Sequence, residues 1–196
     1  MTPNETTDAT QSRAVQAQEL SSREVHAIRP VVSGEALDLL LRDATDDDSW
    51  DLIGLIASCW AEYPGCILDL DGEVPYYRTI ATSFASWGGR FWVAEHQGRV
   101  VGSIGLAPGA APDEAELRML YVARPYRRRG LARRLVALFD DEARARGARS
   151  ITLWSDTRFV EAHAFYEQLG YTRAAYTREL HDLSHTVEYN FTKRLV

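Results

Sequence analysis

The chain has 196 residues and a net charge of -6, and it is 45% hydrophobic and 26% charged. This length suits one domain with a core large enough to be stable alone, and the composition is that of a globular protein. No apolar run approaches the roughly 20 residues that a membrane-spanning helix needs, and the acidic balance argues against general nucleic-acid binding. A cytoplasmic location is expected, because the first residues lack the basic-then-apolar pattern of a secretory signal.

The first 22 residues are expected to form a disordered tail, because they carry too little apolar surface to offset the entropy of ordering. Residues 23–196 are then expected to form one domain. The segment 24–32 is either a short edge strand or more tail, since Pro30 disfavours a central strand. Thr45 is a candidate N-cap, followed by three aspartates where carboxylates suit the helix dipole.

Hydrophobic periodicity predicts one strand, two helices, three strands, a helix, a strand, a helix and two strands, in that order. Strands are expected at 37–42, 91–95, 100–106, 115–122, 150–154, 171–179 and 186–192, and helices at 46–63, 76–87, 131–146 and 159–169. A Gln97-Gly98 turn joins the second and third strands as a hairpin. The expected fold class is therefore α+β, with a mixed, mostly antiparallel sheet of about six to seven strands and about four helices.

The segment 115–132, AELRMLYVARPYRRRGLA, runs from a strand through an arginine-rich loop into a helix. Ten arginines lie between residues 118 and 149, so an acidic chain carries one basic segment. A helix N-terminus offers free N–H groups and a partial positive charge, and Gly130 lets the backbone approach a phosphate closely. The pattern R-x-x-G-x-A at 127–132 therefore predicts a phosphate site that is neither a dinucleotide fingerprint nor a P-loop.

This loop resembles the acetyl-CoA-binding motif of the GNAT superfamily of N-acetyltransferases, [Q/R]-x-x-G-x-[G/A] after a strand. Residues 162–171, AHAFYEQLGY, resemble a second element of that superfamily, A-x-x-x-Y-E-x-x-G-[F/Y]. The two motifs stand in the family's order and separation, and the resemblance covers roughly residues 37 to 194. It implies a single-domain GNAT-like fold whose strands are splayed at the CoA site.

The resemblance also implies where acetyl-CoA, the co-substrate, would bind. Backbone amides of 127–132 would hold the pyrophosphate, with the flanking arginines as further donors. The pantetheine arm would pair with the main chain of 120–122, and the amide near Leu120 would polarise the thioester carbonyl. The expected cofactor residues are Leu120, Tyr121, Val122, Arg127, Arg128, Arg129, Gly130, Leu131, Ala132 and Arg133.

Two catalytic residues follow from the same comparison. Tyr166 matches the family tyrosine that protonates or hydrogen-bonds the departing thiolate, although its place on an apolar helix face also suits a core tyrosine. A base is needed because an amine of pKa ~10 is protonated at neutral pH. Glu116, four residues before Leu120, is the expected base; the alternative is a carboxylate paired with Arg118 or Arg90.

Further candidates surround the acceptor. His163 is another candidate base. Asp69, Asp71 and Glu73 lie where the family's first two helices form the acceptor wall, and are expected to hold a cationic amine unless the loop is merely solvated. Their spacing resembles a truncated calcium loop with too few ligands, so no metal is expected. Phe159 stands where many family members have an asparagine, and Asp156 or Arg158 would take over that contact.

The function expected from the sequence is transfer of an acetyl group to a primary amine, in a small molecule or a peptide, by direct attack in a ternary complex. Cys59 and Cys66 fall in no motif, so a covalent acyl-enzyme is not needed. The alternative is a CoA-binding sensor or partner module without transferase activity. No nucleic acid or membrane is expected as a partner, a homodimer is compatible with the resemblance, and the acceptor itself is not readable.

Overall fold

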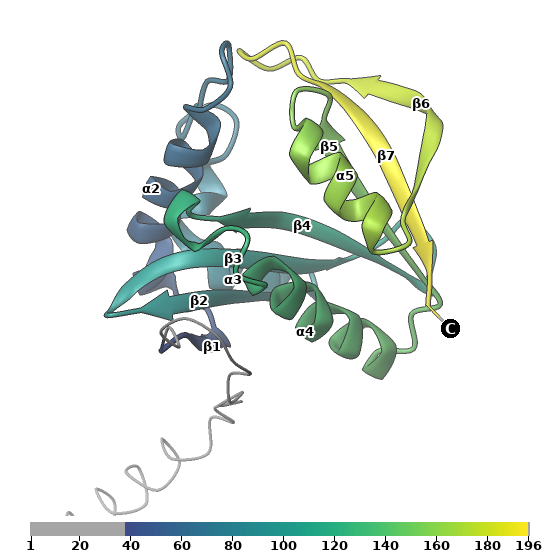
Figure 1. The fold of residues 1–196 in the computed structure, drawn as a ribbon, viewed down its shortest axis with the longest axis horizontal. Helices are drawn as coiled ribbons and strands as arrows, with labels where there is room; N and C mark the ends of the chain where they lie inside the picture. The colour runs from purple at the N-terminus through teal and green to yellow at the C-terminus, as the bar shows by residue number, and fades with distance from the viewer. Residues whose placement is uncertain (1–37, 196) are drawn as a thin grey trace, which may run out of the picture.

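The computed structural model describes residues 38–195. The expected tail at 1–22 and the segment 24–32 lie outside the described residues. Seven strands form one sheet in the order β1-β2-β3-β4-β5-β7-β6 (Figure 1). Of the described strand pairs, β4 with β5 is the only parallel one, which confirms the mixed, mostly antiparallel sheet. None of the described helices has the length and apolarity to cross a membrane.

The order of the elements agrees with the sequence prediction. The strands are β1 (Leu40–Asp43), β2 (Arg90–His96), β3 (Arg99–Pro108), β4 (Glu114–Val122), β5 (Ser150–Asp156), β6 (Thr172–Glu179) and β7 (Val187–Arg194). The α-helices are α2 (Ser49–Trp60), α3 (Ile80–Ser86), α4 (Leu131–Ala145) and α5 (Val160–Gln168). Three 3-10 turns, η1 (Asp46–Asp48), η2 (Pro75–Thr79) and η3 (Arg124–Tyr126), precede α2, α3 and α4.

The first two helices are shorter than predicted. The first begins as the 3-10 turn η1, and α2 ends at Trp60 rather than near Tyr63. Beyond Trp60 the chain continues as tighter turns, in which Glu62 and Tyr63 donate to carbonyl groups three residues back, and Pro64 disfavours the helical region for Tyr63. The second begins at Pro75 as the turn η2, so only its last part, α3, is α-helical.

Helices cover both faces of the sheet, and strand β2 shows how the sequence arranges this. Phe91 and Val93 belong to the core formed with α2 and α3, whereas Trp92 and Ala94 belong to the core formed with α4. Successive side chains of a strand point to opposite faces, so an unbroken apolar run requires cover on both. In Figure 1, α4 and α5 lie in front of the sheet, and α2 and α3 lie behind it.

Strands β4 and β5 separate halfway along their length. They are paired from Glu114↔Ser150 to Leu117↔Leu153, and the pairing ends there. Strand β5 continues with β7 as far as Asp156↔Glu188, while β4 continues with β3 alone. The expected splay is confirmed, and the two strands diverge visibly in Figure 1. The facing edge of β4 therefore has backbone groups that the sheet does not pair, which is costly in a buried place unless another partner satisfies them.

A bulge lies in β4 at the start of the splayed part. The register between β3 and β4 shifts there, and Met119 has a φ of 54°, in the left-handed region. Ser103 of β3 donates a hydrogen bond from Oγ to the carbonyl oxygen of Met119 at 2.8 Å. A bulge bends and twists a strand locally and often adjoins an active site. Here it reorients β4 just before residues 120–122.

Candidate active site

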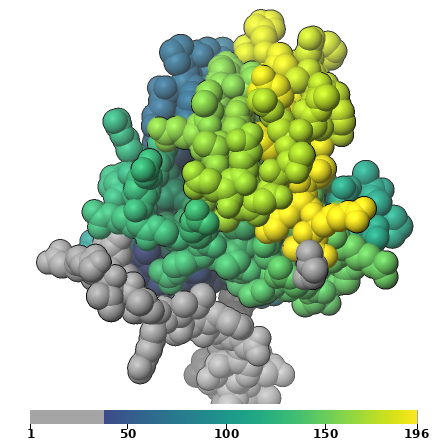
Figure 2. All heavy atoms as spheres, turned by 45° about the vertical axis from the view of Figure 1, so that its right-hand side comes forward, coloured from purple at the N-terminus to yellow at the C-terminus, as the bar shows by residue number. Residues whose placement is uncertain are grey.

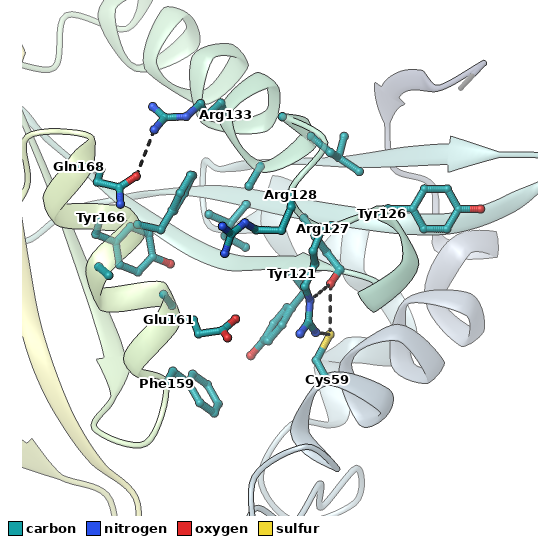
Figure 3. A pocket seen from close by; sticks show the side chains of 18 of the residues that line it. Cys59, Tyr121, Tyr126, Arg127, Arg128, Arg133, Phe159, Glu161, Tyr166 and Gln168 are labelled. Atoms are coloured by element: carbon teal, nitrogen blue, oxygen red, sulfur yellow. Dashed lines mark hydrogen bonds between the residues drawn. The ribbon is translucent and has the colours of Figure 1, made fainter. Parts of the chain in front are cut away.

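A cavity of about 560 Å³ lies beside the splayed part of β4, bounded by the start of α4, by α5 and by the end of α2 (Figure 3). In the space-filling view, the green surface of α5 adjoins the blue surface of the α2 region (Figure 2). Nine of the ten expected cofactor residues line this cavity, and Arg129, an exposed residue, lies outside the lining. The nine are Leu120, Tyr121, Val122, Arg127, Arg128, Gly130, Leu131, Ala132 and Arg133.

The N-terminus of α4 opens onto this cavity, as the sequence predicts. Gly130 is its N-cap residue and has a φ of 81°, which glycine adopts without the steric cost that a side chain adds. The N–H groups of Leu131, Ala132 and Arg133 occupy the first turn, where no acceptor exists within the helix. These amides and the dipole of a 15-residue helix make an anion site at the cavity wall.

Arg127 differs in role from the arginines beside it. Its guanidinium donates to both oxygens of Glu62, at 2.9 and 2.7 Å, and its Nε donates to the carbonyl oxygen of Val122 at 2.8 Å. A further contact joins it to Cys59 Sγ at 3.4 Å. Its backbone N–H bonds to the carbonyl of Arg124. The Arg127 side chain therefore holds the loop against Glu62 and Cys59 at the end of α2 and against β4.

Two other arginines face the cavity. The side chain of Arg128 extends into it in Figure 3. Arg133 lies across the cavity from α5 and donates to Gln168 Oε1 at 3.3 Å, with its guanidinium 5.9 Å from the Phe165 ring centroid. Both can place positive charge beside an anion bound at the N-terminus of α4.

A second cavity, of about 340 Å³, lies on the other side of the splay. It is lined by β4, β5 and β7, by η2 and the loop before it, and by the connection between β6 and β7. Six residues line both cavities, namely Trp60, Leu120, Tyr121, Phe159, Ala162 and Tyr166. The two cavities therefore meet at the bulged part of β4, where a ligand in one can reach a ligand in the other.

Tyr166 stands at this junction. The residue is only 6% exposed, and its hydroxyl points into the first cavity (Figure 3), with no hydrogen-bond partner among the described residues. Burial raises the pKa of Tyr166 above its usual value. The phenol is therefore protonated at neutral pH and is available as a hydrogen-bond donor. Its position agrees with the role expected from the sequence and also places it in the core.

Of the expected acceptor residues, two line the second cavity and two do not. Glu116 and Glu73 are in the lining. Asp69 accepts the backbone N–H groups of its own turn, and Asp71 binds Arg78 at 2.8 Å on the surface, so both act within the loop. Across residues 38–195, no group of three or more His, Cys, Asp or Glu side chains is arranged to hold a metal ion.

Glu116 pairs with Arg118, whose Nη2 lies 2.7 Å from Glu116 Oε2. This is one of the alternatives that the sequence left open. The other, a pair with Arg90, does not form, because Arg90 binds Asp43 and Glu142 instead.

His163, by contrast, lies in the core. Its Nε2 is 2.9 Å from the carbonyl oxygen of Asp156, and its ring packs against Tyr189 and Phe191. Burial lowers the pKa of His163, so the imidazole is neutral at pH 7. It lies outside the lining of both cavities.

The N-terminal end of α5 closes the junction from the side opposite β4. Phe159 lines both cavities, and its ring packs against Tyr63 with centroids 4.6 Å apart. An apolar ring therefore occupies the position where many family members have an asparagine. Asp156 lines the second cavity, but its carboxylate is bound by Arg158.

The structure adds Glu188 to the second cavity, a residue that the sequence did not single out. Arg178 donates from Nε to Glu188 Oε2 at 2.6 Å, and the side chain of Glu188 is 15% exposed. Burial raises the pKa of Glu188, and the pair with Arg178 only partly offsets this. The one signal in the sequence is an alternation, since Glu188, Asn190 and Thr192 alternate with the apolar or aromatic residues Val187, Tyr189 and Phe191.

Comparison with known proteins agrees with this geometry. The model of the acetyltransferase (GNAT) family matches residues 53–171, more than half of the chain. The chain belongs to the GNAT acetyltransferase family. It is 31% identical over 141 residues to the uncharacterized N-acetyltransferase YjgM of Escherichia coli, which covers 70% of this chain and 84% of that protein. It is 33% identical over 119 residues to N-acetyltransferase 8 of Homo sapiens, and the match spans half of that protein.

Solved structures share the fold. An acetyltransferase from Streptococcus agalactiae superposes with a TM-score of 0.68 at 23% identity, over 80% of this chain and 98% of that one. The acetyltransferase yncA from Salmonella typhimurium, solved with its cofactor acetyl-CoA, gives a TM-score of 0.61 at 17% identity, over 81% and 94% of the two chains. The family model and the N-acetyltransferase relatives together show that this GNAT protein is an acetyl-CoA-dependent acyltransferase.

Proposed function

We propose that this enzyme transfers the acetyl group of acetyl-CoA to a primary amine by direct attack, with both substrates bound at once. The observation that carries the proposal is the meeting of two cavities at the splayed part of β4, at Leu120, Tyr121 and Tyr166. A sensor that only binds CoA needs the first cavity. A transferase also needs the second, with access to the thioester, and this favours transfer over the sensor alternative.

In this proposal, the N-terminus of α4 binds the pyrophosphate, with Arg128 and Arg133 beside it. The pantetheine arm pairs with the free edge of β4 at residues 120–122, where the sheet leaves backbone groups unpaired. The backbone amide near Leu120 stabilises the oxyanion that forms on the thioester carbonyl. The acetyl-CoA bound to the Salmonella relative supports the choice of co-substrate.

Tyr166 acts on the leaving group in this proposal. When the amine attacks the carbonyl carbon, the C–S bond breaks and negative charge develops on sulfur. A protonated phenol can donate a hydrogen bond to that sulfur, and the proton lost by the amine nitrogen completes the thiol. No cysteine carries the acetyl group, so the transfer needs no acyl-enzyme.

Release of free CoA thiol in the presence of a panel of amines tests the proposal. Tyr166→Phe is expected to lower turnover by about 100-fold, the usual contribution of a positioned acid, with CoA affinity nearly unchanged. Tyr171→Phe is the matched control, because it also removes a buried hydroxyl without a partner, away from both cavities. Equal turnover in the two variants would remove the acid role, and no transfer to any amine would favour the sensor.

Glu116 as the base, Glu73 as an acceptor contact, a cytoplasmic location, a homodimer and independence from metals, nucleic acids and membranes stay predictions. Glu116 and Glu73 at least line the second cavity, which supports a place for both near the acceptor. The acceptor itself is a primary amine of a small molecule or a peptide.

A further inference from the structure

Five carboxylates line the acceptor cavity, and they come from separate elements: Glu73, Glu116, Asp156, Asp182 and Glu188. A residue that takes a proton from the acceptor must satisfy three geometric conditions. It must face the cavity and lie beside the splayed part of β4, where the thioester is expected. It must also keep at least one oxygen free of other donors. The strand pairings and the hydrogen bonds separate these five carboxylates.

Strand register gives the level of each residue along the splay. The last pair between β4 and β5 is Leu117↔Leu153. Leu120 lies three residues beyond this pair on β4, and Asp156 lies three residues beyond it on β5, paired in turn with Glu188. Glu188 therefore lies beside the splayed part of β4 that contains Leu120, where the thioester is expected.

Glu116 lies at a different level. It is paired with β5 at Glu116↔Thr152, below the point where the strands separate. It also lies four residues before Leu120, which is about 13 Å along an extended strand at about 3.3 Å per residue. The bulge at Met119 shortens this separation without bringing Glu116 into the splayed part.

The hydrogen bonds distinguish Asp156 from Glu188, the two strand carboxylates beside the splayed part of β4. Both oxygens of Asp156 are taken by Arg158, through its backbone N–H and its guanidinium. Glu188 accepts one bond, from Arg178 to Oε2, and its Oε1 has no donor among residues 38–195. Glu73 and Asp182 accept backbone N–H groups on the connecting loops rather than lying on the rigid strands.

We propose that Glu188 is the catalytic base, binding the ammonium group of the acceptor and taking one proton from it. The inference rests on the proposed acetyl transfer. The proton moves from the ammonium to Glu188, and the neutral amine attacks the thioester carbon. The C–N bond forms as the C–S bond breaks, and the second nitrogen proton reaches the sulfur. The products are the amide, free CoA thiol and the proton on Glu188, which returns to water.

The surroundings of Glu188 suit this step. Burial, Asp156 and Glu116 all raise the pKa of Glu188, whereas Arg178 lowers it. Arg118 of β4, which pairs with Glu116, also lines the cavity, and Arg158 pairs with Asp156. The pKa of the carboxylate is therefore higher than that of an exposed glutamate, which makes it a stronger base.

The pH dependence of kcat/KM tests the proposal, using the panel amine with the highest turnover. The wild-type kcat/KM should be constant between the pKa of Glu188 and the pKa of the amine. At pH values below the pKa of Glu188 it should decrease, because the base is protonated. In Glu188→Gln only amine that is already neutral reacts, so the rate should rise tenfold per pH unit towards the amine pKa of about 10. At pH 7 the loss should be about 100-fold.

Glu179→Gln is the matched control, since Glu179 is an exposed glutamate on β6 and should keep the wild-type profile. Glu188→Asp keeps a carboxylate and should retain an acid limb at reduced rate. Melting temperature and CoA affinity establish that each variant is folded. The proposal is overturned if Glu188→Gln keeps the flat wild-type dependence of kcat/KM on pH. It is also overturned if Glu116→Gln is the one variant that loses this flat region.

A binding measurement separates this inference from the proposed function. Calorimetry follows butylamine binding to the CoA-saturated enzyme at pH 7, where the amine is a cation. Glu188→Gln should weaken this binding at least tenfold relative to Glu179→Gln. If wild type acetylates no amine but shows this difference, transfer fails and Glu188 still binds the ammonium group. Equal affinities in the two variants overturn the role of Glu188 whatever the activity.

Discussion

The loop before α4 contains three successive arginines, and we predict that the first acts by holding the loop rather than by binding phosphate. Arg127 makes a two-pronged bond to Glu62 and a third bond to the carbonyl of Val122. Replacing Glu62 by Gln removes the partner of the guanidinium without touching the loop. If Arg127 holds the loop, Glu62→Gln should weaken CoA binding, because the backbone amides lose their fixed position.

The magnitude follows from the exposure of the pair. The side chains of Arg127 and Glu62 are 26% and 29% exposed, so the pair is worth about 1 kcal/mol rather than the larger value of a buried one. Glu62→Gln should then raise the Kd for CoA by at most about 5-fold. Arg127→Gln also loses the bond to Val122, worth about another 1 kcal/mol, so its limit is about 30-fold.

The double variant decides between the two roles. Calorimetric Kd values for CoA should be equal in Arg127→Gln and in Glu62→Gln/Arg127→Gln, because Glu62 acts only through Arg127. The coupling energy between the two residues is then about 1 kcal/mol. Arg128→Gln should weaken binding about tenfold or more, as loss of a charged hydrogen bond does, and should add to Glu62→Gln. Glu62→Gln frees the Arg127 side chain from its ion pair. If this variant binds CoA as well as or better than wild type, the holding role is refuted.

Two further substitutions separate ligand binding from stability. Gly130→Ala and Gly147→Ala place a side chain at φ of 81° at opposite ends of α4, with nothing within 4 Å of the new Cβ, so each should cost about 1–2 kcal/mol of unfolding free energy. Only Gly130→Ala should also raise the Kd for CoA, and equal Kd values would place the phosphate elsewhere. Lys193→Met should lower stability by about 3 kcal/mol in denaturant unfolding, because it leaves Asp140, 2.7 Å away and largely buried, without its partner. Unchanged stability, or no recovery in Asp140→Asn/Lys193→Met, would contradict this account.

Much of the fold could be predicted because its signals are local. The apolar run of β2 requires helices on both faces, Gly130 and Gly147 mark the ends of α4, and Gln97-Gly98 turns the hairpin with positive φ at both positions. The predicted end of α2 is three residues too late, because residues 61–63 continue as tighter turns that the periodicity of the side chains does not distinguish from an α-helix. Periodicity records which face is apolar, and the backbone can leave the helix before that pattern ends.

The candidate site was less predictable, because its roles depend on contacts between distant residues. Arg127 is the first residue of the R-x-x-G-x-A pattern, but only its contact with Glu62, 65 residues away, shows that its side chain holds the loop. Glu116 was favoured by its place before Leu120, but the level at which β4 leaves β5 depends on pairing between strands. The alternation around Glu188 indicates a strand with one polar face, but only the pairing of β7 with β5 places that face at the cavity.

The end of α2 and the three residues after it contact three elements of the site. Trp60 lines both cavities and donates from Nε1 to the hydroxyl of Tyr121 at 2.9 Å. Glu62, two residues later, binds Arg127 in the loop before α4. Tyr63, three residues later, packs on Phe159 at the start of α5. One turn thus contacts β4, the loop and α5. The end of α2 therefore connects the three elements that border the first cavity.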